Sequence, residues 1–262
     1  MIRNIGRLSL AALVLAMAGC GQLTPSAPPV NASVLNVADA ALASGNPDMA
    51  LKISQSVLAD DPKNLPALYH EAAAYYASGR CEDAMAAYTV ALGLDPKSSS
   101  AETGIGRCLL NRNAIEAEQA FTAAVADDPQ NAAALNDLGI ARDLRGHFAG
   151  AEKPYEQALL LAPGTLAVEV NLGLSLALAG NPDDALQYLG PLATGAQATP
   201  KIRADYAAAL FANGRADEAR QVLSTDLPPD KVQAMLTAFA LIFTPEPNPK
   251  QAAALLRGEP LA

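Results

Sequence analysis

The chain repeats a pattern of landmark residues with a period of about 34 residues. In two segments, 67–96 and 134–163, a glycine is followed by an alanine 5 residues later, a tyrosine after 4 more, an alanine after 3 more and a proline after a further 5. The landmarks are Gly79, Ala84, Tyr88, Ala91 and Pro96 in the first copy, and Gly146, Ala151, Tyr155, Ala158 and Pro163 in the second. A chain with this period is expected to fold into a stack of similar units rather than around one globular core.

The landmark residues of each unit are those expected at the ends of two antiparallel helices. The glycine can adopt the positive φ of a tight inter-helix turn, and a proline after the second helix prevents its continuation. Small residues at Gly139, Ala151 and Ala158 would allow the two helices to approach closely. Weaker copies occupy residues 34–62, 101–129, 168–195 and 203–227.

These landmarks resemble the tetratricopeptide repeat family over about residues 34–227. Leu68 and Leu135 stand at an early position where the family often has an aromatic residue. The resemblance implies an all-α fold, a right-handed superhelical solenoid of about six repeats within residues 33–227. The segment 228–262 would then supply a C-terminal capping helix near 230–243 and a proline-rich tail, because the open end of a solenoid needs a cover.

The N-terminus is typical of a secretory signal over residues 1–20. Arg3 and Arg7 precede an apolar run that is too short to span a bilayer, and the run ends at Cys20. This ending resembles bacterial lipoprotein signals. The alternative interpretations of residues 1–20 are an ordinary cleaved signal and a membrane anchor. The resemblance implies that Cys20 is lipidated, that residues 21–32 form a flexible Pro/Ser tether, and that Gly21 directs the protein to the periplasmic side of the outer membrane.

Charge and motif content exclude several function classes. The chain has a net charge of −9 and lacks the clustered basic residues that bind nucleic-acid phosphates. The two histidines, His70 and His147, lie far apart and have no neighbouring cysteine, so we predict no metal site. Nucleotide-binding, cofactor-binding and hydrolase motifs are also missing. We therefore predict a protein that is not an enzyme and uses no cofactor or small-molecule substrate.

The resemblance also implies where a protein partner would bind. In this family the first helix of each repeat lines a concave groove, and here its inward positions are mostly apolar, which suits an amphipathic helix or an extended apolar peptide. Some of these residues could instead belong to the inter-helix core. The predicted groove residues are Tyr69, Tyr76, Arg107, Leu110, Asn136, Ile140, Leu144, Val170, Asn171, Leu174, Leu178 and Phe211.

Two cysteines remain if Cys20 is lipidated. Within a tetratricopeptide stack, Cys81 would open the second helix of one repeat and Cys108 would lie near the end of the next first helix, so that the two come together. We predict a disulfide between them, with two buried thiols as the alternative.

The combination of lipidated N-terminus, tether and repeats resembles the pilus-assembly lipoproteins of the tight-adherence (Flp) type. The implied function is that of an outer-membrane adaptor that helps a secretin or another envelope component to assemble. A type IV pilotin, an outer-membrane protein assembly factor and a cell-wall enzyme scaffold are alternatives. Two further alternatives are a periplasmic enzyme and a homo-oligomer whose groove holds the chain's own segment 231–257.

Overall fold

The computed structural model describes residues 30–243 and 249–259. The predicted signal peptide (1–20) and most of the predicted tether lie outside these ranges, and the first helix begins at Val30. Within the described residues every regular element is a helix, which confirms the predicted fold class. The helices are α1 (Val30–Ala43), α2 (Pro47–Asp60), α3 (Leu65–Ala77), α4 (Cys81–Leu94), α5 (Ser99–Leu109), α6 (Ala114–Asp127), α7 (Ala132–Leu144), α8 (Phe148–Leu161), α9 (Leu166–Leu178), α10 (Pro182–Thr194), α11 (Pro200–Ala212), α12 (Ala216–Leu223), α13 (Pro229–Ile242) and α14 (Pro249–Arg257).

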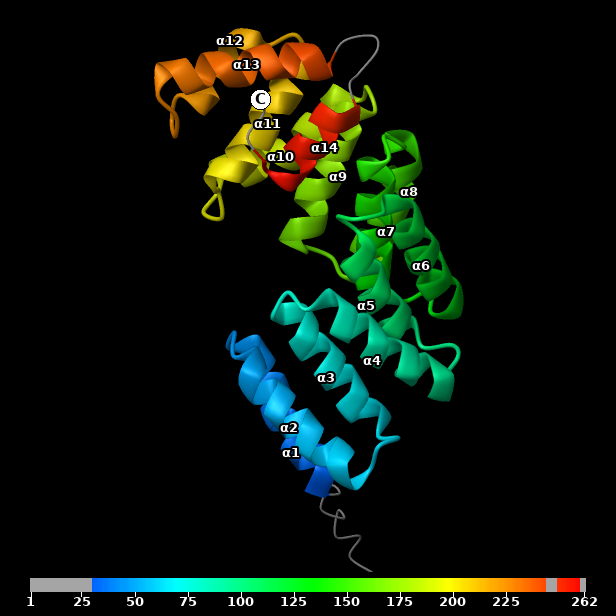
Figure 1. The fold of residues 1–262 in the computed structure, drawn as a ribbon. Coiled ribbons are helices and arrows are strands. Elements are labelled where there is room, and N and C mark those ends of the chain that lie inside the picture. Colours follow the sequence, from blue (N-terminus) through cyan, green and yellow to red (C-terminus); the bar gives the residue numbers. More distant parts are fainter. Residues whose placement is uncertain (1–29, 244–248, 260–262) are drawn as a thin grey trace, which may run out of the picture.

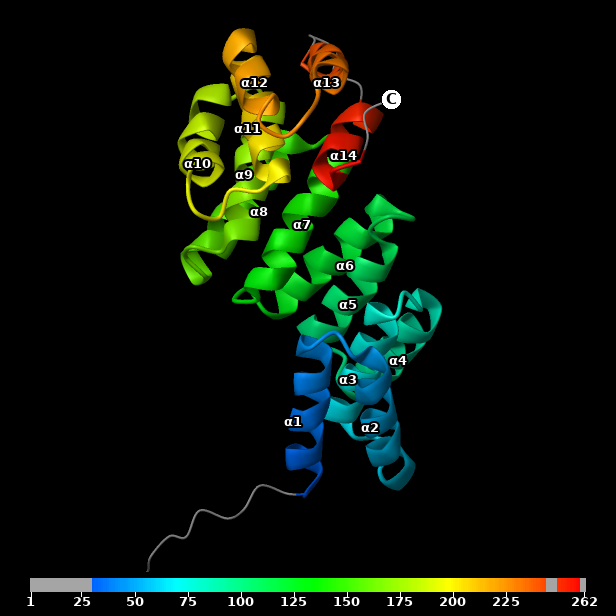
Figure 2. The same cartoon turned by 90° about the vertical axis from the view of Figure 1, so that its left-hand side faces the viewer.

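Helices α1 to α12 form successive antiparallel pairs that stack into a curved solenoid (Figures 1 and 2). Each pair contacts the next, and successive first helices, such as α5 and α7 or α7 and α9, also contact one another. The first helices therefore form one continuous face along the stack. We call this face, made by α1, α3, α5, α7, α9 and α11, the inner face.

The predicted turn glycines are confirmed by their backbone angles. Gly79 and Gly146 have φ values of 73° and 76°, a region that side chains with a Cβ rarely adopt. At the ends of second helices, Asp61, Asp95 and Asp128 are the C-caps of α2, α4 and α6, and each is followed by proline. The sequence landmarks therefore mark the helix boundaries directly.

The predicted close approach inside the repeat is also confirmed. A Cβ placed on Gly139 of α7 would lie 2.6 Å from ring carbons of Tyr155 on α8. Ala151, Tyr155 and Ala158 are fully buried in a hydrophobic cluster shared by α7 to α11. The absent side chain at Gly139 thus makes room for the aromatic ring that fills the joint between α7 and α8.

A capping helix closes the C-terminal end of the stack, as predicted. Phe239 and Ile242 of α13 are buried, and the ring of Phe239 lies 5.9 Å from that of Phe211 on α11, centroid to centroid. Within the described ranges, no helix has both the length and the apolar character needed to cross a membrane.

Candidate protein-binding face

A chain of polar side chains links three neighbouring first helices on the inner face. Arg107 Nε on α5 donates a 2.5 Å hydrogen bond to Asp137 Oδ2 on α7. Asn136 Nδ2 donates to Asp137 Oδ1 over 3.1 Å, and Asn171 Nδ2 on α9 donates to Asn136 Oδ1 over 3.1 Å. The predicted residues Arg107, Asn136 and Asn171 therefore lie together, and Asp137 is a member that the sequence analysis missed.

The arginine on this face is not a free cation. Asp137 is buried, whereas the Arg107 side chain retains 40% of its exposure. The ion pair satisfies the carboxylate, and the outer edge of the guanidinium remains accessible. An incoming chain would meet a polar, nearly neutral centre rather than a basic cradle for carboxylates.

The N-terminal half of the inner face presents aromatic surface. Tyr76 on α3 is 41% exposed, and partial burial raises the pKa of its phenol, with Arg107 and Asp137 close enough to act on it electrostatically. Tyr69 is half-buried, and its hydroxyl lies 2.7 Å from Ser98 Oγ. Leu110, just after α5, is also half-buried. This part of the face can therefore contact a partner.

The centre of the face is less open than predicted. Ile140 and Leu144 on α7 are both half-buried, and Ile140 packs against the cluster that contains Val170. Val170 itself is only 6% exposed. It is therefore a core residue rather than a contact for a partner.

The C-terminal half of the inner face is covered by the chain itself, which corrects the prediction of an open apolar stripe there. Leu174 and Leu178 on α9 are 1% and 9% exposed, and they belong to a hydrophobic cluster that also contains residues of α11, α13 and α14. Helix α14 lies against α7 and α9, where both views place it beside the inner face (Figures 1 and 2). Phe211 is half-buried in the same cluster.

The fit of α14 is incomplete. Its Ala252 and Leu255 are buried, but Gln251 Oε1 is also buried and has no hydrogen-bond partner among the described residues. A buried amide oxygen without a donor costs free energy comparable to a lost hydrogen bond. Helix α14 therefore buries its apolar side chains favourably but leaves one buried polar atom without a hydrogen bond.

A buried carboxylate joins three helices beneath this face. Asp143 Oδ2 accepts a 2.8 Å hydrogen bond from the Tyr155 hydroxyl, and Oδ1 accepts one of 2.7 Å from Ser175 Oγ. Burial raises the pKa of Asp143 to about 7, although both hydrogen bonds lower it. No local pattern in the sequence reveals this joint, because its partners come from α8 and α9.

The two cysteines lie next to each other as free thiols. Cys108 is buried on α5, and Cys81 at the start of α4 is half-buried in the same cluster. Burial, followed by a hydrogen bond with Cys81, raises the pKa of Cys108 to about 12. The structure thus brings the pair together, while the disulfide between them stays a prediction. The lipidation site Cys20 lies outside the described residues.

Charged side chains of the described residues pair with one another across the stack. Among the described residues, no group of three or more His, Cys, Asp or Glu side chains is arranged to hold a metal ion. The ion pair Arg142–Glu118 connects α7 with α6, and Arg203–Asp226 connects α11 with the turn after α12.

Comparison with known families identifies the repeats. One tetratricopeptide repeat model matches residues 41–108 and 176–238, and a second matches residues 111–165. Among curated proteins, the chain is 37% identical over 116 residues to a probable UDP-N-acetylglucosamine–peptide N-acetylglucosaminyltransferase SPINDLY from Hordeum vulgare. That match covers 40% of this chain and only 12% of the plant protein.

Solved structures share the fold over a larger part of the chain. PilW, described as a widely conserved type IV pilus biogenesis factor, matches with a TM-score of 0.67 and 23% identity, over 80% of this chain and 100% of PilW. PilF from Pseudomonas aeruginosa matches with a TM-score of 0.66 and 19% identity, over 79% of this chain and 96% of PilF. At these identities the likeness is one of fold.

Proposed function

Because the chain belongs to the tetratricopeptide repeat family, we propose that it is a non-enzymatic adaptor, anchored to the outer membrane through Cys20, that binds a helical segment of an envelope-assembly protein. The partner would be a component of a tight-adherence (Flp) pilus, such as its secretin. Proteins built from tetratricopeptide repeats bind other proteins, and the inner face supplies the surface for that binding.

The observation that carries the proposal is the position of α14. This short helix contacts α7 and α9 and buries Ala252 and Leu255 in the cluster that also contains Leu174 and Leu178, so the inner face already holds an amphipathic helix of the chain itself. A helix laid along a groove is a recurrent mode of peptide recognition. A partner helix would extend this arrangement over α3, α5 and α7, where Tyr76 and the edge of Arg107 are exposed.

The chemistry of the face defines the partner segment. Arg107 is paired with Asp137, and the two neighbouring asparagines are neutral, so these residues at the centre of the described face offer no unpaired cation for a terminal carboxylate. The segment should therefore be an amphipathic helix with small apolar residues and an aromatic or polar contact at Tyr76.

A type IV pilotin is the second candidate. It is favoured by the fold likeness to PilW, described as a type IV pilus biogenesis factor, over the whole of the PilW structure. Both candidates place the protein at the assembly of an outer-membrane pilus component, and they differ in which system supplies the partner.

Affinity purification from crosslinked membranes tests the proposal. The wild type should capture a secretin or other pilus component, whose identity separates the two candidates, and Tyr76→Asp should lose it. Leu160→Asp on α8 is the matched control, because Leu160 is 81% exposed on a second helix. Capture that is equal in all three proteins would contradict binding at the inner face. A Cys20→Ser protein that still fractionates with the outer membrane would contradict the anchor.

A further inference from the structure

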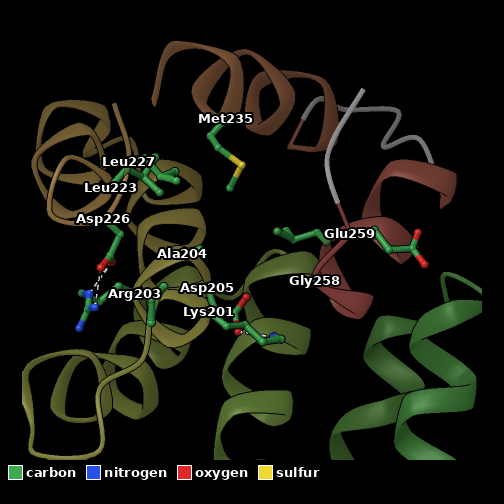
Figure 3. Close-up of a pocket in the computed structure, with 12 residues that line it drawn as sticks. Lys201, Arg203, Ala204, Asp205, Leu223, Asp226, Leu227, Met235, Gly258 and Glu259 are labelled. Carbon is green, nitrogen blue, oxygen red and sulfur yellow. Dashed lines mark hydrogen bonds and ion pairs between the residues drawn. The ribbon is translucent and has the colours of Figure 1, made fainter. Parts of the chain in front are cut away.

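A cavity of about 350 Å³ lies at the C-terminal end of the solenoid, between α11, the end of α12, α13 and α14 (Figure 3). Its volume falls in the range of small-molecule and side-chain binding sites. Most of its walls are apolar, so a ligand would have to be largely apolar as well. The apolar walls are made by Ala204, Leu223, Leu227, Met235 and Leu255.

One buried carboxylate lies in the wall of this cavity. Asp205 on α11 is 1% exposed, and its Oδ2 accepts a 2.7 Å hydrogen bond from Lys201 Nζ. Its Oδ1 has no donor within the part of the chain that the structure describes. In Figure 3 one oxygen of Asp205 turns to Lys201 and the other points into the space below Met235.

The second oxygen of Asp205 is therefore an acceptor that a ligand could satisfy. Burial raises the pKa of Asp205 to about 6, while the Lys201 ammonium lowers it. The group is thus mostly ionised at neutral pH. A hydrogen bond from a ligand to this oxygen would stabilise the complex, because folding has already removed the oxygen from water.

The charges around the cavity are already paired. Besides the Lys201–Asp205 pair, Arg203 donates two hydrogen bonds, of 2.6 and 2.7 Å, to the carboxylate of Asp226. At the opposite rim, Glu259 accepts from Arg257. A second cation would be repelled by Lys201, and an anion would be repelled by Asp205. The donor that suits Asp205 Oδ1 is therefore a neutral N–H or O–H.

We propose that this cavity binds a neutral aromatic ring that carries one N–H or O–H donor, as presented by a tryptophan or tyrosine side chain of a protein partner. The ring would lie among the leucines and against the Met235 thioether, a favourable contact for an aromatic edge. Its donor would reach Asp205 Oδ1. This site goes beyond the proposed function, because it lies away from Tyr76 and Arg107 and its test requires no partner protein.

Methyl-resolved NMR of the purified full-length protein, labelled with ¹³C at the methionine methyl groups, tests the proposal. Indole should shift the Met235 signal through the ring current and leave those of Met49 on α2 and Met85 on α4 unchanged. The probe 1-methylindole has the same ring without the donor and should bind at least about tenfold more weakly. N-acetyltryptophanamide, which carries the ring as a protein does, should cause the same Met235 shift as indole. Its fluorescence should also move to the blue, and the protein adds no tryptophan emission of its own because the chain has no tryptophan.

Two variants of neighbouring residues complete the test. Ala204→Leu fills the cavity and should abolish binding of both indoles, whereas Asp205→Ala should bind them with equal affinity. If Asp205→Ala does not fold, the comparison of the two indoles on the wild type still decides the role of the donor. A Met235 signal that does not respond to indole, or equal affinity of the wild type for both indoles, would overturn the proposal. Binding of indole without binding of N-acetyltryptophanamide would overturn its assignment to a protein side chain.

Discussion

The hydroxyl of Tyr155 on α8 donates a 2.8 Å hydrogen bond to Asp143 Oδ2 on α7, inside the joint that also receives Ser175 from α9. The carboxylate is 1% exposed and has no cation among its hydrogen-bond partners. The joint between the fourth and fifth repeats is thus built on an acid whose charged form is disfavoured by burial.

This joint should make stability depend on pH. Burial raises the pKa of Asp143 from its ordinary value of 3.8 to about 7 in the folded protein. Between these values the folded state binds more protons than the unfolded state, so the contribution of Asp143 to stability falls as pH rises from about 4 to 7. We expect denaturant unfolding to show a loss of up to about 4 kcal/mol over this range that Asp143→Asn does not show. Parallel pH profiles of the two proteins would rule this out.

The contact between Gly139 and Tyr155 predicts a large cost for one methyl group. In Gly139→Ala the new Cβ would lie 2.6 Å from the ring of Tyr155, so α7 and α8 must separate or the ring must move. We expect a loss of about 1–3 kcal/mol in the free energy of unfolding. Gly93→Ala is the matched control: nothing lies within 4 Å of its Cβ, and the helical site should gain about 0.5 kcal/mol. Equal effects in thermal or urea unfolding would refute the packing argument.

The covering of α9 by α14 predicts that removal of the tail uncovers apolar surface. Deletion of residues 244–262 should expose Leu174 and Leu178, which are 1% and 9% exposed in the intact chain. Binding of a hydrophobic dye should rise while helical content falls only by the loss of α14. A chain that ends at Glu259 keeps α14 and should bind the dye like the wild type. If deletion of residues 244–262 does not increase dye binding, the claim that α14 covers the apolar residues of α9 is wrong.

The adjacent thiols of Cys81 and Cys108 predict a disulfide after export to an oxidising compartment. Protein purified from the periplasmic side should carry no free thiol at these two positions. Its reduction should cost about 2–4 kcal/mol of stability, because the crosslink restricts the unfolded chain. Mass spectrometry after thiol labelling without reductant checks this. Full labelling of both cysteines in natively exported protein would contradict the disulfide and show that the two residues are packed thiols.

Local signals predicted the framework of this fold. Gly79 and Gly146 mark turns, and the Asp-Pro pairs mark the ends of α2, α4 and α6, because these preferences act within a few residues of the chain. The repeat period then placed Tyr69, Tyr76 and Arg107 on the first helices. The pairing of the helices and the capping role of α13 follow from the same pattern.

The candidate site was only partly predictable, because its remaining features depend on contacts between distant segments. Leu174 and Leu178 are surplus apolar residues on α9, and nothing near them in sequence shows that α13 and α14 cover them. Lys201 and Asp205, four residues apart on one helix, have the spacing of an ordinary surface ion pair, yet Asp205 is buried in a cavity wall. Arg107 was predicted only as a groove residue, and its ion pair with Asp137 on the next first helix joins residues 30 positions apart.

Site-specific photo-crosslinking in living cells tests the central claim most directly. A benzophenone amino acid would replace Tyr76, which is 41% exposed on the inner face, and in a matched protein Leu160, which is 81% exposed on α8. If the protein is an adaptor that binds through its inner face, the probe at position 76 should form a specific adduct with an outer-membrane pilus component, and the probe at position 160 should not. An adduct formed only from position 160, or no envelope adduct from either position, would contradict the account.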